Sequence, residues 1–171
     1  MSLTMSRVSV PLFVRGLKVL STLLQKGEEF AAEKGMLPEV LLGARLAEDM
    51  LPLSAQIQRA SDASKLCVHR LAGGDAPKFP DDETSFQQLQ ERIAKTIAYL
   101  ESVAAADVDA STDKTIQLNW GSFAPTFSGE EYLLSFGLPN FYFHVVTAYD
   151  ILRNQGVKIG KLDYLGAFDK A

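Results

Sequence analysis

The stretch Leu53–Leu71, LSAQIQRASDASKLCVHRL, carries the pattern on which the fold prediction rests. Apolar and small residues recur there, and just before it, in alternating steps of four and three: Leu46, Met50, Leu53, Ile57, Ala60, Ser64, Cys67 and Leu71. This spacing forms one core-facing stripe, as in a helix of a helical bundle. We expect the helix to begin near Asp49, with Pro52 in its first turn, and to end at AGGDAP, residues 72–77.

Three other long segments have helical spacing. A first helix is predicted from Val10 to Lys34, before Gly35, and one or two short turns follow Pro38. A third helix is predicted after a cap at Thr84 or Ser85, with an apolar face made of Phe86, Leu89, Ile93, Ile97, Leu100 and Val103. The last begins at Ser128, where SGEE has the capping-box pattern, and runs to Gln155. Pro139 should kink it or split off its first turns.

The segment between the last two helices has a different pattern. A small β-hairpin around a Gly-Ser turn is predicted there, with Thr115, Ile116, Leu118 and Trp120 before the turn and Phe123, Thr126 and Phe127 after it. Its aromatic residues should rest on the bundle, because an isolated hairpin is marginally stable. The tail after Gly156 is predicted to be an irregular extension, with apolar residues up to Phe168 available for packing. We therefore predict one all-α domain over residues 1–171, a four-helix bundle with a hairpin before the last long helix.

Composition excludes several functions. The net charge is −4, and the 17 basic residues are scattered along the chain, whereas a nucleic-acid surface needs them clustered. No apolar run approaches the length of a membrane span, so no membrane partner is expected. The single cysteine, Cys67, cannot form an internal disulfide, which favours a reducing, cytoplasmic location.

The stretch Gly137–Gly156, GLPNFYFHVVTAYDILRNQG, contains one of the two histidines, His144. A metal site on a single helix would need a second ligand three or four residues away, but those positions hold Thr147 and Ala148. Upstream, Asn140 and Phe141 offer no imidazole or carboxylate. His144 is therefore expected to be a packed or pocket histidine, and neither a metal nor another cofactor is predicted.

The remaining chemically interesting residues favour a binding pocket over a nucleophilic site. Cys67 lies on the core stripe, and no nucleophile elbow, phosphate loop or HExxH motif occurs. Gln56 lies beside the same stripe, and a buried amide needs a hydrogen-bond partner, which His144, Asn140 or Tyr142 could supply. These four residues, Gln56, Asn140, Tyr142 and His144, form the predicted ligand pocket.

The other charged and ionisable residues are predicted to be peripheral. His69 is expected at the surface near a helix end. Asp62 and Lys65 are predicted to form a solvent-facing pair, and the acidic run 81–83 is interpreted as helix-entry charge.

Three segments resemble a family. Residues 45–65 (RLAEDMLPLSAQIQRASDASK), 86–102 (FQQLQERIAKTIAYLES) and 138–166 (LPNFYFHVVTAYDILRNQGVKIGKLDYLG) are similar to an uncharacterised bacterial domain-of-unknown-function family of the DinB/YfiT-like superfamily. The resemblance implies a four-helix bundle with up-down-down-up topology, and often a homodimer. Better-known relatives bind a divalent metal through three histidines, and some are thiol-dependent transferases.

This sequence departs from that metal pattern. The ligand position of the second helix falls near Gln56, and the motif resembling HVVNH reads HVVTA, so Ala148 stands where a ligand would. Two histidines cannot form a three-histidine site. Three hypotheses follow: a metal-free bundle with a small-molecule pocket, a divalent-metal thiol transferase with an unusual ligand set, and a dimeric interaction protein. Whether the chain is an enzyme stays open at this point.

Overall fold

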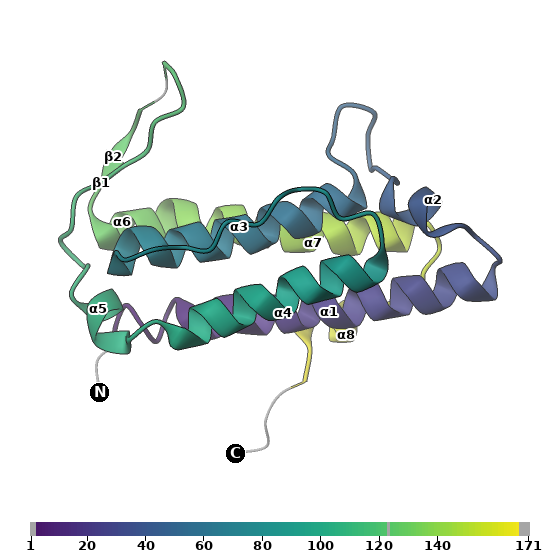
Figure 1. Cartoon of the computed structure of the whole chain (residues 1–171), viewed down its shortest axis with the longest axis horizontal. Coiled ribbons are helices and arrows are strands. Elements are labelled where there is room, and N and C mark those ends of the chain that lie inside the picture. Colours follow the sequence, from purple (N-terminus) through teal and green to yellow (C-terminus); the bar gives the residue numbers. More distant parts are fainter. Residues whose placement is uncertain (1–2, 123, 168–171) are drawn as a thin grey trace.

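The computed structural model describes residues 3–122 and 124–167. Four long helices pack in two layers (Figure 1): α1 (Val10–Glu33) beside α4 (Phe86–Ser102), and α3 (Leu53–Ala72) beside α7 (Leu138–Asn154). Followed along the chain, α1 and α7 run in one direction and α3 and α4 in the other. The predicted up-down-down-up bundle is confirmed.

The core lies between the two layers and comes from all four long helices. Its large side chains with almost no exposure include Phe13, Leu17, Leu20, Leu23 and Leu24 of α1, Leu53, Ile57 and Leu71 of α3, Leu89 of α4 and Phe141 of α7. Gly16 allows α1 and α7 to approach closely, because a β-carbon there would lie 2.5 Å from the Phe141 ring. The predicted stripe of α3 thus faces the core, apart from its first residues.

The predicted start of this helix is wrong. Helix α3 begins at Leu53, not near Asp49, and Pro52 is its extended N-cap residue. A proline disfavours helical geometry in the residue before it, so the chain from 45 to 52 cannot continue the helix backward. The short helix after Pro38 is α2 (Pro38–Leu42), and another short helix, α5 (Ala105–Asp109), follows α4.

The C-terminal tail is also more regular than predicted, because it contains α8 (Lys161–Leu165). The backbone N–H of Gly160 donates to the Asp163 carboxylate at 2.7 Å and caps the start of this helix. Asp163 also pairs with Lys26 at 2.6 Å, and Arg15 donates to the Leu165 carbonyl, so α8 is fastened to α1. Phe168, an apolar residue of the tail that is predicted to be available for packing on the body or on a partner, lies outside the described residues.

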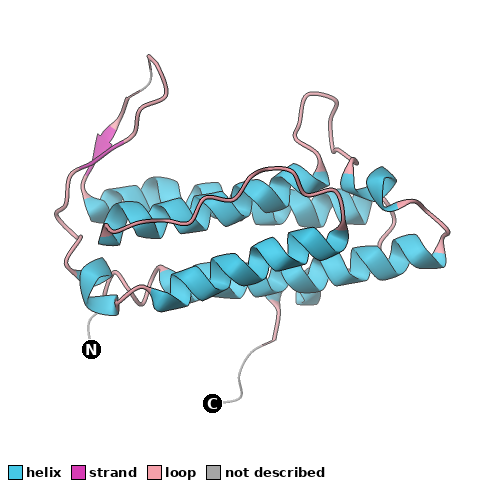
Figure 2. Cartoon of the chain, in the orientation of Figure 1, coloured by secondary structure: helices cyan, strands magenta, loops and turns pink. Residues whose placement is uncertain are grey.

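The predicted hairpin is present but short (Figure 2). Strand β1 (Ile116–Gln117) pairs antiparallel with β2 (Thr126–Phe127), with Ile116 opposite Phe127. Phe123 lies outside the described residues. The hairpin rests on the bundle through aromatic contacts: Trp120 with Phe136 at 5.2 Å between ring centroids, and Phe127 with Tyr132 at 6.1 Å.

The last long helix is interrupted where Pro139 predicted an irregularity. Helix α6 (Gly129–Tyr132), capped by the Ser128 hydroxyl, leads into a π-helical turn, η1 (Leu133–Gly137), and then into α7. The wide turn precedes Pro139, whose missing N–H and ring are incompatible with a regular helix interior. Gly137 packs against α3, since a β-carbon there would lie 2.5 Å from the Cys67 sulfur.

The long connection of residues 73–85 runs back along α3 to reach the start of α4 (Figure 1) and brings acidic residues to the α3–α4 interface. Arg92, with a side chain 1% exposed, lies 2.9 to 3.1 Å from Asp62, Asp81 and Glu83. Lys65 is buried as well and lies 2.9 Å from Asp62. With Arg59, 3.1 Å from Asp81, these residues make up what we call the ion cluster: Arg59, Asp62, Lys65, Asp81, Glu83 and Arg92.

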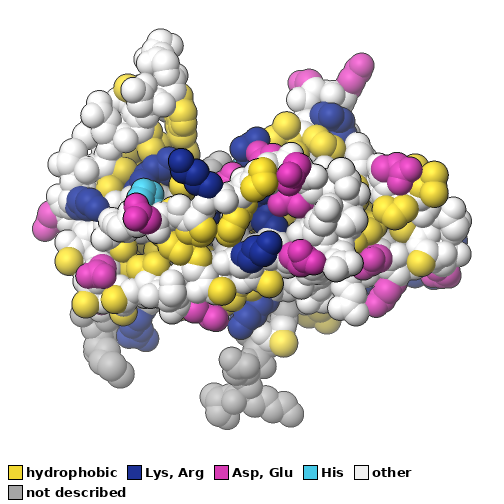
Figure 3. Space-filling model, viewed as in Figure 1, with side chains coloured by type: hydrophobic (Ala, Val, Ile, Leu, Met, Phe, Trp, Pro, Cys, Tyr) yellow, Lys and Arg dark blue, Asp and Glu magenta, His cyan; other side chains and the backbone are white. Residues whose placement is uncertain are grey.

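The ion cluster corrects two predictions. Asp62 and Lys65 pair with each other, but Lys65 is buried, so the pair does not face solvent. Asp81 and Glu83 do not serve only as charges at the start of a helix, because they bind side chains of α3 and α4. Spacing along one helix cannot reveal a loop that folds back over it. On the face shown in Figure 3, acidic and basic side chains are interspersed. No helix of the described residues has the length and apolar character needed to cross a membrane.

Candidate functional site

The α3–α7 interface contains a hydrogen-bonded pair of polar side chains, Gln56 and His144. The Nδ1 atom of His144 lies 2.8 Å from Oε1 of Gln56, whose side chain is only 1% exposed. Gln56 Nε2 donates to the backbone carbonyl of Leu51 at 3.0 Å. That second bond fixes which end of the amide faces the histidine.

The orientation of the Gln56 amide determines the tautomer of His144. An amide oxygen can only accept, so Nδ1 of His144 must carry the proton and donate to it. Nε2 then bears the lone pair. Within the described residues Nε2 has no hydrogen-bond partner, and it is not one of their fully buried, unpartnered atoms.

The surroundings keep His144 neutral. Burial and, to a smaller extent, the nearby Arg59 guanidinium lower its pKa to about 4. A histidine with such a low pKa is a weak general base near neutral pH but a good hydrogen-bond acceptor. The chemistry offered by this side chain is therefore the recognition of an O–H or N–H group.

The two other predicted pocket residues lie differently. Asn140 is half-buried one turn before His144 on α7, and its amide has no hydrogen-bond partner among the described residues. Tyr142 faces α1, where its hydroxyl donates to the Leu12 carbonyl at 3.4 Å. The structure thus pairs Gln56 with His144, keeps Asn140 on the same side of α7, and does not bring Tyr142 to the pair.

Sequence reasoning missed Arg59, a charged residue near the Gln56–His144 pair. Helices α3 and α7 are antiparallel, because Gln56 contacts His144 while Cys67 contacts Gly137. Arg59 lies one turn beyond Gln56 on the same face of α3, so the antiparallel register places it on the Asn140 side of the Gln56–His144 pair. The spacing of Gln56 and Arg59 was the available signal, but it could be interpreted only once the partner helix was known.

The other reactive side chains in the described part of the chain do not form a second site. Cys67 is buried, and burial raises its pKa to about 12 despite the opposing effect of Arg70, so the thiol is not a nucleophile. Arg70 donates to the Tyr132 hydroxyl at 2.9 Å. His69 is half-buried rather than at the surface, and its Nδ1 is buried without a hydrogen-bond partner among the described residues.

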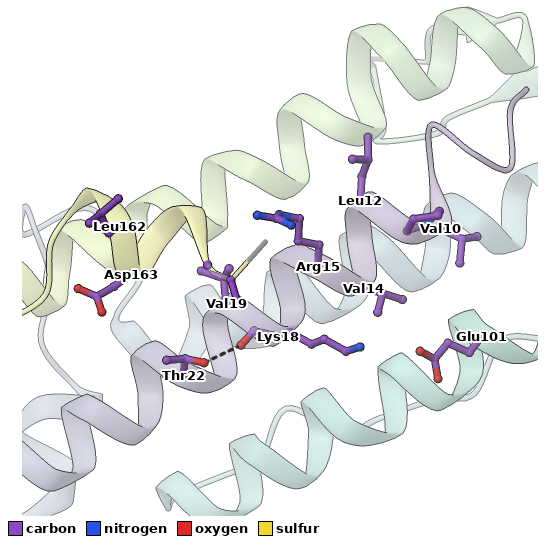
Figure 4. A pocket seen from close by; sticks show the side chains of 13 residues that line it. Val10, Leu12, Val14, Arg15, Lys18, Val19, Thr22, Glu101, Leu162 and Asp163 are labelled. Carbon is purple, nitrogen blue, oxygen red and sulfur yellow. Dashed lines mark hydrogen bonds between the residues drawn. The ribbon is translucent and has the colours of Figure 1, made fainter. Parts of the chain in front are cut away.

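A groove of about 980 Å³ lies on the outer side of α1, between α8 and the end of α4 (Figure 4). Valines 10, 14 and 19 contribute apolar surface, and Arg15, Lys18, Glu101 and Asp163 are charged side chains around it. No histidine or cysteine lines it. It is separate from the Gln56–His144 pair, whose residues do not contribute to its lining.

The residues around the Gln56–His144 pair do not fit the three-histidine metal site of the DinB/YfiT-like superfamily, which the sequence resembles. Among the described residues, no group of three or more His, Cys, Asp or Glu side chains is arranged to hold a metal ion. Ala148 is fully buried and apolar, and Nδ1 of His144 is engaged by Gln56. Only the Nε2 atom of His144 and the amide of Asn140 are left there, which is too few good donors for a zinc site.

Comparison with known proteins agrees with the fold. The family described as "Domain of unknown function (DUF1993)" matches residues 5–165. A crystal structure of a DinB family member protein from Shewanella denitrificans is 40% identical, with a TM-score of 0.89, and the match covers 97% of this chain and 94% of that one. No curated protein matches significantly. The chain therefore belongs to the DUF1993 family, with a DinB-like fold.

Proposed function

We propose that this protein binds a small molecule at the Gln56–His144 pair without a metal ion. The observation that carries the proposal is the chain of hydrogen bonds from the Leu51 carbonyl through Gln56 to His144. This chain leaves Nε2 of a neutral imidazole as an acceptor without a partner among the described residues. A polar group held in one orientation beside apolar surface is typical of ligand pockets between bundle helices.

The apolar surface beside His144 is Phe143. Its ring lies 5.3 Å from the imidazole, edge to face, and the side chain is 56% exposed. An aromatic ligand could cover this ring while donating a hydrogen bond to Nε2. The divalent-metal transferase hypothesis has less support, because the described side chains do not supply its ligands and Cys67 is buried.

The test is a titration of the full chain with 1-phenyl-1,2-ethanediol, a neutral aromatic donor, followed by the ¹⁵N shifts of the histidine rings. We expect Nε2 of His144 to shift saturably. His144→Phe should abolish binding, whereas His69→Asn, which replaces the other histidine, should retain it. If the diol moved no signal at His144, or bound equally well to His144→Phe, the proposal would be wrong.

A homodimer is proposed as a second property, supported by exposed apolar residues. Leu162 on α8 is 80% exposed and borders the α1 groove. Sizing with light scattering should give a dimer mass for the native chain and a monomer mass for Leu162→Glu. An unchanged mass would count against it. A cytoplasmic location stays a prediction, supported by the single buried thiol of Cys67.

A further inference from the structure

The face that presents His144 also presents a guanidinium. On α3, Arg59 lies one turn beyond Gln56, and on α7, Asn140 lies one turn before His144. The antiparallel register of the two helices therefore gathers four polar side chains on one side of the interface. Gln56 and His144 bind each other at 2.8 Å, while Arg59 and Asn140 lie about one turn farther along.

The ion cluster holds the Arg59 side chain in place but does not engage all of its N–H donors. It is 46% exposed, and its Nη2 donates to Asp81 at 3.1 Å. Nη1 lies 3.9 Å from Asp62, beyond hydrogen-bond distance. A guanidinium has five N–H donors in a rigid fork, so a ligand carboxylate can still be bound.

The carboxylates beside Arg59 are also bound by the two buried cations of the ion cluster. Asp62 also binds Lys65 at 2.9 Å and Arg92 at 3.1 Å, and Asp81 binds Arg92 at 3.0 Å. Arg92 and Lys65 are buried, whereas Arg59 is the accessible cation of the cluster. The positive field of Arg59 also reaches His144, where it helps to lower the imidazole pKa.

From this arrangement we infer that the site takes a small organic anion whose carboxylate binds Arg59 and whose O–H or N–H group donates to His144 Nε2. The inference rests on the proposed function and specifies its ligand class. An anion without a donor would leave Nε2 unpartnered, and a neutral donor would leave unused the Arg59 N–H groups that Asp81 does not bind. The ligand class that satisfies both groups is a hydroxy or amido carboxylate, and Phe143 favours an aromatic substituent.

Three matched probes separate the contributions: mandelate, phenylacetate without the hydroxyl, and 1-phenyl-1,2-ethanediol without the charge. Each is titrated into the full chain at low ionic strength, and Kd is read from the His144 and Arg59 signals. Mandelate should bind at least about tenfold more tightly than either of the others, as expected for one added charge-assisted contact.

Variants test the assigned roles. Arg59→Gln should raise the mandelate Kd about tenfold, to that of the diol, and leave the diol Kd unchanged. Arg59→Lys retains the charge and should give an intermediate value, which guards against loss of folding in the first variant. Arg153→Gln, at an exposed position near the end of α7, is the matched control and should not change any Kd.

The outcomes distinguish this inference from the proposed function. If the diol and mandelate bound equally at His144, or if Arg59→Gln left the mandelate Kd unchanged, the anion inference would be wrong and the pocket would stand. If none of the three probes moved the His144 signals, both would be wrong.

Discussion

Lowering the pH should destabilise the protein through His144, because the native state holds this ring neutral. Its pKa is about 4 in the folded chain, below the ordinary 6.5 expected after unfolding. The unfolded chain therefore binds the proton more tightly. The stabilising contribution is present above pH 6.5 and is lost as the pH falls toward 4.

The size of the effect follows from these two values. Between about pH 7.5 and pH 5.5, the linkage relation gives a loss of about 1.3 kcal/mol in the free energy of unfolding. The ring is partly exposed, and solvent screening reduces the expected loss to about 1 kcal/mol. The acids with lowered pKa values, such as Glu83 and Asp163, contribute in the same direction but mainly at lower pH.

Urea unfolding followed by circular dichroism at the two pH values, in wild type and in His144→Asn, isolates the histidine. The asparagine amide can replace the Nδ1–H donor to Gln56 but does not titrate. The variant should lose about 1 kcal/mol less than wild type between the two pH values. His69→Asn leaves His144 in place, so the His144 contribution should remain in it. An equal loss in wild type and His144→Asn would refute the reasoning.

Three other predictions test the surroundings of the site. Arg92→Met removes the buried guanidinium that binds three carboxylates and should lower the free energy of unfolding by about 3 kcal/mol or more; Lys95→Met, at an exposed position of the same helix, should change it by less than about 0.5 kcal/mol. Gly137→Ala places a methyl group against the Cys67 sulfur and should lower the free energy of unfolding by roughly 1–3 kcal/mol. The double variant with Cys67→Ala should lose less stability than the sum of the losses in the two single variants, and strict additivity in denaturant melts would contradict this contact. Tyr142→Phe removes only a long hydrogen bond to α1 and should leave the His144 ring shifts unchanged; a changed tautomer would place Tyr142 in the site after all.

The long helices could be predicted from the sequence because each presents a regular stripe to one core. The stripe of α3 and the cap of α4 at Ser85 are local signals, and no long-range information was needed to interpret them. Predicted ends were less accurate at Asp49, where the restriction imposed by Pro52 outweighed helical spacing. The tail was underpredicted because α8 is stabilised by contacts with α1, at Lys26 and Arg15.

The site depended on information that one helix alone does not contain. Gln56 was noticed because a buried amide needs a partner, but helix rotation decides that the partner is His144 and that Tyr142 faces α1. Arg59 and the ion cluster were missed because the acids that hold them come from the connection of residues 73–85. Nothing in the periodicity of α3 indicates that a later loop covers that face.

The central claim, a neutral His144 that donates to Gln56 and binds no metal, is tested most directly by long-range ¹H–¹⁵N spectra of the histidine rings at pH 6. Spectra are recorded before and after one equivalent of zinc. We predict the neutral tautomer protonated at Nδ1 in both spectra, with Nε2 unchanged by zinc. A protonated imidazolium, a proton on Nε2, or a stoichiometric shift of the His144 nitrogens on adding zinc would contradict the account.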